Sequence, residues 1–416
     1  MKGNDSAMKS KLPILFMPTT NQDEYRDASE KEYSLYFHFP FCVDKCSFCS
    51  IKTIACNGID FELYLDAMLC ELIKYKSILN SQKISSIHFG GGTPSLLSVY
   101  EIEKIVKAIL ACLKDRDDVE IVFESHPSSL SYEKINCLSQ FPKVTLNLGI
   151  QTFDSHQLSL INRFPQREDM IDKLVYAKQK DFYAVGIDII AGLPGSSIQS
   201  VLDDITIAVE LELDHISLYP LRIEKESTLY EKPENYIIPK KVECIEMIEF
   251  AKYYLQENGY FPRSIFCWSN NEKDTYRYST NQMKGNEWIG IGAGAYTYLE
   301  KKIYLNHIHV DCYIKSSMNN NITYCSMETQ NTTANIIWEI SFLLRKGNID
   351  YDFLKNKYGD LIKPYIDRII TLLCELGYAF YDDDNNMLTI TTRGIVNFDQ
   401  IENIINKEAL EIYGQN

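Results

Sequence analysis

Three cysteines lie close together in a spacing that could bind a metal cluster. Cys42, Cys46 and Cys49 form a C-x3-C-x2-C pattern. Three neighbouring thiolates can each ligate one iron of a [4Fe–4S] cluster and leave the remaining iron for another ligand. The nearest further cysteine, Cys56, lacks a suitable spacing to complete the set. The pattern therefore predicts a cluster with one open iron.

Two other interpretations of the triplet are structural zinc and plain buried thiols. A closed zinc site usually takes four ligands in two close pairs, and the sequence has no second C-x2-C pair. Free cysteines are common in protein cores. The position of the triplet favours the cluster, because it directly follows an apolar strand-like run, and loops after parallel strands carry chemistry.

Strand-like apolar runs alternate with amphipathic helical segments through the first half of the chain. The six runs cover residues 34–39, 85–89, 119–124, 143–149, 183–190 and 214–219. Apolar strands that are each followed by a helix indicate parallel βαβ units. Six such units predict an α/β fold with an open, partial (β/α)6 barrel.

The remaining segments predict four regions. Residues 1–33 form an N-terminal extension, and residues 34–317 form the barrel with its accessory segment. Residues 318–335 are rich in Asn, Thr and Ser and are predicted to be a linker. Helical segments and a small hairpin within 336–416 predict a helical, winged-helix-like C-terminal domain.

Charge and hydropathy exclude several classes of protein. The 416 residues carry a formal net charge of -15, which disfavours binding to nucleic acid. The acidic tip at 382–384 makes a winged-helix DNA-binding regulator the least favoured class. No apolar run is long enough for an integral membrane segment, and no secretory signal is visible. We therefore expect a cytoplasmic protein whose cysteines are thiols or metal ligands.

Further motifs are collinear with the cysteine triplet, and together they resemble those of radical S-adenosylmethionine (SAM) enzymes. More narrowly, the sequence resembles the oxygen-independent coproporphyrinogen III oxidase-like family, which includes heme chaperones of the HemW type. The motifs lie mostly at the ends of the expected strands and cover residues 36–41, 90–95, 124–127, 149–153, 188–195, 215–221 and 290–295.

The resemblance implies a radical mechanism. A [4Fe–4S] cluster would bind SAM and cleave it to a 5′-deoxyadenosyl radical. The chain would bind either this one SAM molecule or a second one as well. This radical would abstract hydrogen from a porphyrin-like or other small-molecule substrate, and flavodoxin or ferredoxin would supply the electron.

The resemblance also implies roles for single residues. Cys42, Cys46 and Cys49 would be the iron ligands. At the methionine of SAM, the predicted contacts are the backbone of Gly91 and Gly92 with Thr93, Glu124 at the ammonium and Arg163 at the carboxylate. Gln151 and Asp188 would contact the ribose. Tyr36 and Phe48 would pack beside the cluster and the adenine. An ordinary ion pair between Glu124 and Arg163 is the alternative for those two residues. His38, His88 and His215 are interpreted as core residues.

Two departures from the family leave the reaction open. Ile51 stands where coproporphyrinogen oxidases carry a further cysteine. Residues 278–283 read Tyr-Ser-Thr-Asn-Gln-Met where the heme chaperones carry H-N-x-x-Y-W. The alternatives are a class C radical methyltransferase of a specialised metabolite and a heme chaperone that binds heme without catalysis. Substrate contacts are expected within 264–287.

Overall fold

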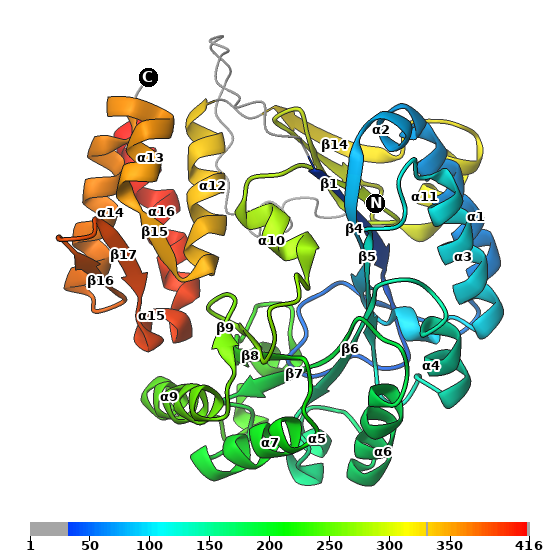
Figure 1. Cartoon of the computed structure of the whole chain (residues 1–416), viewed down its shortest axis with the longest axis horizontal. Coiled ribbons are helices and arrows are strands. Elements are labelled where there is room, and N and C mark those ends of the chain that lie inside the picture. Colours follow the sequence, from blue (N-terminus) through cyan, green and yellow to red (C-terminus); the bar gives the residue numbers. More distant parts are fainter. Residues whose placement is uncertain (1–31, 330–331, 414–416) are drawn as a thin grey trace.

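The computed structural model describes residues 32–329 and 332–413 (Figure 1). Of the predicted N-terminal extension, residues 1–31 lie outside the described residues. Glu32 and Tyr33 already belong to the first strand, because β1 (Glu32–Phe39) pairs with its neighbour from its first residue onward.

The predicted parallel barrel is confirmed. Its six strands are adjacent in chain order and parallel: β1, β4 (Lys83–Gly91), β5 (Glu120–Ser125), β6 (Val144–Gln151), β7 (Ala184–Ala191) and β8 (His215–Pro220). The helices between them and after β8 are α1 (Phe61–Lys74), α2 (Lys76–Ser81), α3 (Val99–Cys112), α4 (Tyr132–Leu138), α5 (Ser155–Leu160), α6 (Arg167–Lys178), α7 (Ile198–Glu210), α8 (Thr228–Glu231) and α9 (Lys241–Glu257). Side-chain caps fix several helix starts, such as the capping box of Ser98 and Glu101 at α3.

The sheet is wider than the six predicted strands. β11 (Trp288–Ile291) adds a seventh parallel strand beside β1. Antiparallel strands follow it at one edge: β12 (Tyr296–Leu299), β13 (Lys302–Asn306) and β14 (Tyr324–Thr329). The other edge carries β10 (Cys267–Ser269) and β9 (Phe261–Pro262), and the two-residue strands β2 (Phe41–Cys42) and β3 (Ile54–Ala55) pair separately. The glycine-rich segment 290–295 therefore begins beside Tyr36, with which Gly290 is in register.

The predicted linker over 318–335 contains regular structure. α11 (Val310–Met318) ends at its first residue, β14 occupies its middle, and α12 (Thr332–Lys346) includes its end. Polar composition did not prevent a strand here, because β14 is a largely exposed edge strand that pairs only with β13 in the sheet. The exact boundary between the two parts of the chain stays a prediction.

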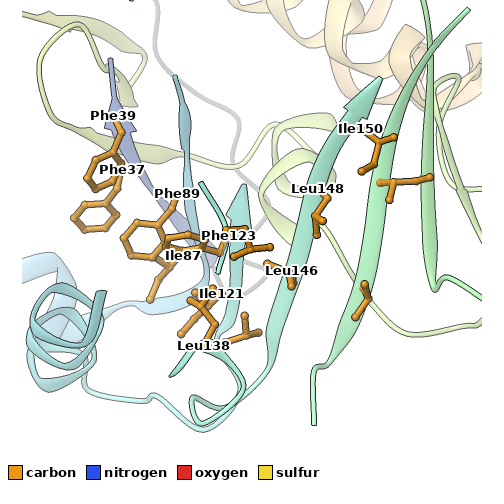
Figure 2. Packing of buried hydrophobic residues seen from close by; sticks show 14 of the residues in the cluster. Phe37, Phe39, Ile87, Phe89, Ile121, Phe123, Leu138, Leu146, Leu148 and Ile150 are labelled. Atoms are coloured by element: carbon orange, nitrogen blue, oxygen red, sulfur yellow. The ribbon is translucent and has the colours of Figure 1, made fainter. Parts of the chain in front are cut away.

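Side-chain alternation along the strands separates the core from the barrel interior. Leu35, Phe37 and Phe39 of β1 are buried in the main core, where Phe37 stacks on Phe89 of β4 (Figure 2). Because successive residues of a strand face opposite sides, the residues between them face the other way. Tyr36 and His38 of β1 thus point into the barrel interior, where the Tyr36 ring also contacts His88.

A short helix from the divergent segment packs inside the barrel. In α10 (Arg277–Met283), the side-chain amide of Asn281 donates to Ser34 Oγ at 3.0 Å and to Ser85 Oγ at 2.8 Å. Buried Glu120 of β5 accepts the backbone N–H groups of Tyr276 and Arg277 at the start of this helix. These contacts fix α10 against β1, β4 and β5.

The C-terminal part is a helical unit with a three-stranded sheet, as expected for a winged-helix-like arrangement. It contains α12, β15 (Asn348–Asp350), α13 (Tyr351–Tyr358), α14 (Lys363–Glu375), β16 (Ala379–Asp382), β17 (Met387–Ile390), α15 (Thr392–Val396) and α16 (Phe398–Tyr413), with sheet order β15-β17-β16. It lies beside the barrel, with α12 nearest to α10 (Figure 1). Trp288 of β11 stacks on Trp338 of α12 at 5.7 Å between ring centroids, so the two parts share an aromatic contact. No helix in the described ranges has the length and apolar character needed to cross a membrane.

Candidate active site

The three predicted cysteine ligands lie in one loop at the carboxyl end of β1. Cys42 ends β2, and the loop closes where the Cys56 N–H donates to the Cys42 carbonyl at 2.9 Å. The Cys49 N–H donates to the Cys46 carbonyl at 3.1 Å, and this hydrogen bond closes a tight turn between the two cysteines. All three cysteines are free thiols of intermediate exposure, and burial raises the pKa of Cys42 and of Cys49.

Neighbouring segments hold this loop in place. The Ser47 N–H donates to the Ile161 carbonyl at 3.0 Å, and the Ser47 carbonyl accepts from Leu229 N at 3.0 Å. The Lys45 ammonium donates to the Glu226 carbonyl at 2.7 Å. The loop after β1 is therefore fixed to the segments that follow β6 and β8.

Arg163 lies against the cysteine loop. Its Nη1 is 3.7 Å from Cys46 Sγ, and its Nη2 donates to the Gly149 carbonyl at the end of β6. The residue is 5% exposed, and its Nε has no hydrogen-bond partner among the described residues. Burial lowers the pKa of this guanidinium, whereas the nearby Cys46 opposes that effect. A buried cation with an unused donor beside three thiols is suited to bind an anionic group.

The glycine segment at the end of β4 lies directly against Glu124. A Cβ on Gly90 would be 2.8 Å from Glu124 Oε2, and one on Gly92 would be 2.5 Å from the Phe41 carbonyl oxygen. Gly91 has φ +108°, a conformation that side-chain-bearing residues rarely adopt. Thr93 Oγ1 lies 3.4 Å from Cys42 Sγ. The segment thus joins the cysteine loop to the Glu124 carboxylate without intervening side chains.

Glu124 and Arg163 do not form the alternative ion pair. Glu124 Oε1 instead lies 2.9 Å from His88 Nε2, and its side chain keeps 38% of its surface exposed. Arg163 contacts Cys46 and Gly149, as described above. Glu124 therefore lies against the glycine segment, and Arg163 lies against the cysteine loop.

Gln151 and Asp188 lie further along the same rim. Gln151 ends β6 with φ +72°, where the pairing register with β7 shifts. Asp188 Oδ2 accepts a hydrogen bond from Asn147 Nδ2 at 2.8 Å. Burial, followed by the charge of Glu124, raises the pKa of Asp188 to about 7. A half-buried carboxylate of this kind favours ligands that donate hydrogen bonds.

Tyr36 lies in an aromatic cluster, whereas Phe48 is peripheral. The Tyr36 ring stacks on Tyr278 of α10 at 5.4 Å, and its hydroxyl lies 3.1 Å from His38 Nδ1. Burial lowers the pKa of His38 to about 4, so the imidazole is neutral at ordinary pH. Phe48 is half-buried and packs against the main core. Of the predicted aromatic pair, Tyr36 is the one that the structure brings to the barrel interior.

The donor set fits an iron–sulfur cluster and an amino-acid-like cofactor better than one metal ion. Among the described residues, no group of three or more His, Cys, Asp or Glu side chains is arranged to hold a single metal ion. A cluster takes its thiolates on different irons, so its ligands are spread more widely. Beside the loop, four buried polar atoms of the described residues lack partners: His88 Nδ1, Ser125 Oγ, Asn147 Oδ1 and Arg163 Nε. Buried polar groups without partners are rare unless a ligand or water satisfies them.

A cavity of about 960 Å³ opens from this site toward the C-terminal unit. Tyr36 and His38 line its inner end, and Ile51 lies at the loop after the third cysteine. The aromatic side chains Tyr278, Trp288, Tyr296, Trp338 and Phe342 also line it. The glycine-rich segment contributes residues 293–295. Of the predicted cofactor residues, Tyr36 is the one that lines the cavity, whose walls come from both parts of the chain.

Several residues of the site were missed from the sequence. His38 and His88 were interpreted as core residues, yet they contact Tyr36 and Glu124. Their alternation with Phe37 and Phe89 in the strands was the available signal, because it places them on the inner face. Substrate contacts were expected within 264–287. Of that stretch, Tyr278 and Gln282 line the cavity, and the other lining residues come from other segments of the chain.

Comparison with known proteins agrees with this geometry. The model of the radical SAM superfamily matches residues 36–207. The heme chaperone HemW of Lactococcus lactis is 30% identical over 69% of this chain and 75% of its own length. The heme chaperone HemW of Bacillus subtilis is 26% identical over 86% of this chain and 95% of its own length. Among solved structures, coproporphyrinogen III oxidase (HemN) from Escherichia coli, described as a radical SAM enzyme, aligns with TM-score 0.76 and 20% identity, covering 91% of this chain and 90% of that one.

The fold and the cysteine loop together define a radical SAM protein, a class whose domain implies a [4Fe–4S] cluster and SAM. Within that class, the chain belongs to the family of HemW-like heme chaperones and oxygen-independent coproporphyrinogen III oxidase-like proteins. The family membership expected from the collinear motifs is thereby confirmed.

Proposed function

We propose that this chain is a radical SAM enzyme in which Cys42, Cys46 and Cys49 hold a [4Fe–4S] cluster with an open iron. The closed loop that contains the three free thiols supports this assignment. A cluster held by these cysteines would supply, with SAM, the one-electron chemistry for cleaving the sulfonium C–S bond and abstracting hydrogen from a substrate. The chain's own residues bind, orient and shield the reactants.

The residues around the loop are proposed to orient SAM. Arg163 forms a charge-assisted hydrogen bond with the carboxylate, for which its unpartnered Nε is suited. Glu124 accepts from the ammonium, and Gly91 and Gly92 let the backbone approach the methionine closely. Thr93 lies at the same end, next to Cys42.

The nucleoside half of SAM is proposed to lie along the carboxyl ends of β6 and β7. The Asp188 carboxylate accepts from ribose hydroxyls there, and Gln151 adds an amide at the rim. Tyr36 packs beside the cofactor from β1, whereas Phe48 supports the cysteine loop from the core side.

The substrate is proposed to be a flat, carboxylate-bearing small molecule of tetrapyrrole type. The observation that carries this proposal is the cavity with aromatic lining residues, which reaches the predicted cofactor residue Tyr36 and its neighbour His38. Trp288 and Trp338 stack on one another and are buried, whereas the half-buried rings of Tyr278 and Tyr296 offer apolar surface to a large conjugated molecule. Ile51 at the cavity wall supplies no thiol, so a reaction other than that of the oxidases is open.

A second candidate is a heme chaperone that binds heme without turnover. It is favoured by the names of the HemW relatives, one of which is 30% identical to this chain. Against it, the segment 278–283 carries no histidine and is folded into α10 inside the barrel. A class C methyltransferase with a second SAM is a further outcome that the experiment below can detect.

An anaerobic assay separates these candidates. Reconstituted protein is incubated with reductant and SAM against coproporphyrinogen III or heme, and the products are measured by mass spectrometry. Release of 5′-deoxyadenosine only with a given substrate supports the enzyme, and S-adenosylhomocysteine with a methylated product supports the methyltransferase. A saturable Soret band without turnover supports the chaperone and contradicts the enzyme.

The electron donor is proposed to be flavodoxin or ferredoxin, and the compartment is proposed to be the reducing cytoplasm. The donor would dock beside the cysteine loop. Val43 in this loop is 60% exposed, and Phe164, next to Arg163, is 66% exposed. The two segments are joined because Asn162 Nδ2 donates to the Lys45 carbonyl at 3.1 Å. Apolar side chains at this point would let a donor protein approach the cluster closely.

A further inference from the structure

Two arginines meet at the cavity from different parts of the chain. Arg222 follows β8 of the barrel, and Arg345 lies in the last turn of α12. Both line the cavity and are about one-third exposed, at 34% and 36% of their side-chain surface. One carboxylate lies between them: Glu402 of α16 is 3.0 Å from Arg345 Nη2 and 3.7 Å from Arg222 Nη1.

The charges at this point do not balance. Two guanidinium cations share the Glu402 carboxylate, whereas the nearby Asp399 already pairs with Lys241 at 3.9 Å. Each guanidinium has five N–H donors, and Glu402 leaves most of them unused. Glu224 and Glu226 also line the cavity, together with Lys52 and Lys225, so the charged residues of its lining still carry one excess positive charge.

Aromatic rings fix the planes of both guanidinium groups. Arg345 lies over the Phe342 ring at 5.0 Å, and Arg222 lies over the Phe398 ring at 5.6 Å. A guanidinium that stacks on a ring keeps its edge free for the two oxygens of a carboxylate. Such preorganisation lowers the entropy lost when an anion binds.

We propose that Arg222 and Arg345 form a carboxylate-binding subsite of the cavity, in which Glu402 is an internal competitor. The ligand's conjugated body packs against the half-buried rings of Tyr278 and Tyr296, and one of its peripheral carboxylates takes the place of Glu402 at the two guanidinium edges. The inference rests on the proposed function for the class of substrate. It adds the residues that would select a carboxylic acid over its ester.

The test measures binding, so it is independent of turnover. Cluster-loaded full-length protein is titrated anaerobically with coproporphyrin III and with its tetramethyl ester in the same detergent, and the Soret shift gives the Kd. The acid should bind at least about tenfold more tightly than the ester. This ratio corresponds to a difference of about 1.4 kcal/mol in binding free energy. Arg222→Gln and Arg345→Gln should each weaken binding of the acid by about tenfold and leave the ester unchanged.

Glu402→Gln distinguishes the subsite from a clamp between the two parts of the chain. If Glu402 competes with the ligand, its replacement should tighten binding of the acid. The matched control pair is Arg368 and Glu408, which lie 3.1 Å apart on α14 and α16 and do not line the cavity. Arg368→Gln and Glu408→Gln should leave both affinities unchanged, and thermal melting of every variant checks folding.

The outcomes separate failure of the subsite from failure of the proposed function. If acid and ester bind equally and the arginine variants change neither, the subsite is overturned while the substrate class stands. Weaker binding in Glu402→Gln would likewise overturn the competitor role. If the wild-type protein binds neither molecule, the proposed substrate class fails, and the subsite fails with it.

Discussion

The guanidinium of Arg163 lies 3.7 Å from the Sγ of Cys46, with its Nε unpartnered among the described residues. This pair links the cysteine loop to the end of β6, where Arg163 also donates to the Gly149 carbonyl. The same arginine side chain therefore contacts a predicted cluster ligand and is the predicted partner of the SAM carboxylate.

Arg163→Gln should retain the cluster and lose SAM affinity. A charge-assisted hydrogen bond contributes about 1.5–3 kcal/mol, so SAM binding should weaken by roughly 10- to 100-fold. Arg163→Lys should recover only part of this loss, because it lacks the planar fork. Iron content and SAM affinity by equilibrium dialysis measure the two effects, and a complete loss of iron would show that Arg163 supports the loop instead.

Gly90 and Gly92 should respond differently to a single added methyl group. In Gly92→Ala the Cβ meets the Phe41 carbonyl, which belongs to rigid backbone beside Cys42, so iron incorporation should fall and stability should drop by about 1–3 kcal/mol. In Gly90→Ala the Cβ meets the Glu124 carboxylate, which can shift, so iron should be retained while SAM binding weakens by about tenfold. Equal loss of iron in both variants would contradict separate roles.

SAM affinity should rise with pH because of Asp188. Its carboxyl has a pKa of about 7, and ribose hydroxyls donate to the ionised form. Below this pKa, binding must release a proton, so affinity should increase from roughly pH 6 to pH 8 and then level off. Asp188→Asn should bind more weakly at high pH and show a flat profile. The same slope in Asp188→Asn would assign the titration to another group.

The donor surface can be tested with two reductants. The double change Val43→Asp and Phe164→Asp should reduce SAM cleavage driven by flavodoxin, because it removes exposed apolar contacts beside the cysteine loop. Cleavage driven by dithionite should be unchanged. Phe250→Asp on α9, where the side chain is 52% exposed, is the matched control. Equal losses with both reductants would place the damage in the cluster rather than in docking.

The parallel strands could be predicted because each is largely buried with an apolar core face and is followed by a helix. The expected run 34–39 is contained in β1 (Glu32–Phe39), and the cysteine loop follows it as expected. β11 was harder to predict, since only four residues, Trp288–Ile291, precede a glycine-rich turn. Its pairing with β1 depends on contacts between segments that are far apart in the sequence.

The cofactor side of the site was more predictable than the substrate side. Motifs at strand ends place Glu124 and Asp188 locally, because a strand end fixes where a side chain lies. Arg222, Arg345 and Trp338 come from the ends and faces of separate elements, and only the packing of α12 and α16 beside the barrel brings them to one cavity. No local pattern in the sequence encodes that packing.

The central claim is that three thiolates of one loop hold a cluster with an open iron. Anaerobic reconstitution should give about four iron atoms per chain, and SAM should change the electron paramagnetic resonance signal of the reduced cluster. Replacing Cys42, Cys46 and Cys49 together with alanine should abolish both the iron and the signal. Retention of iron by this triple variant, or a stoichiometric zinc ion in the wild-type protein in place of the cluster, would contradict the account.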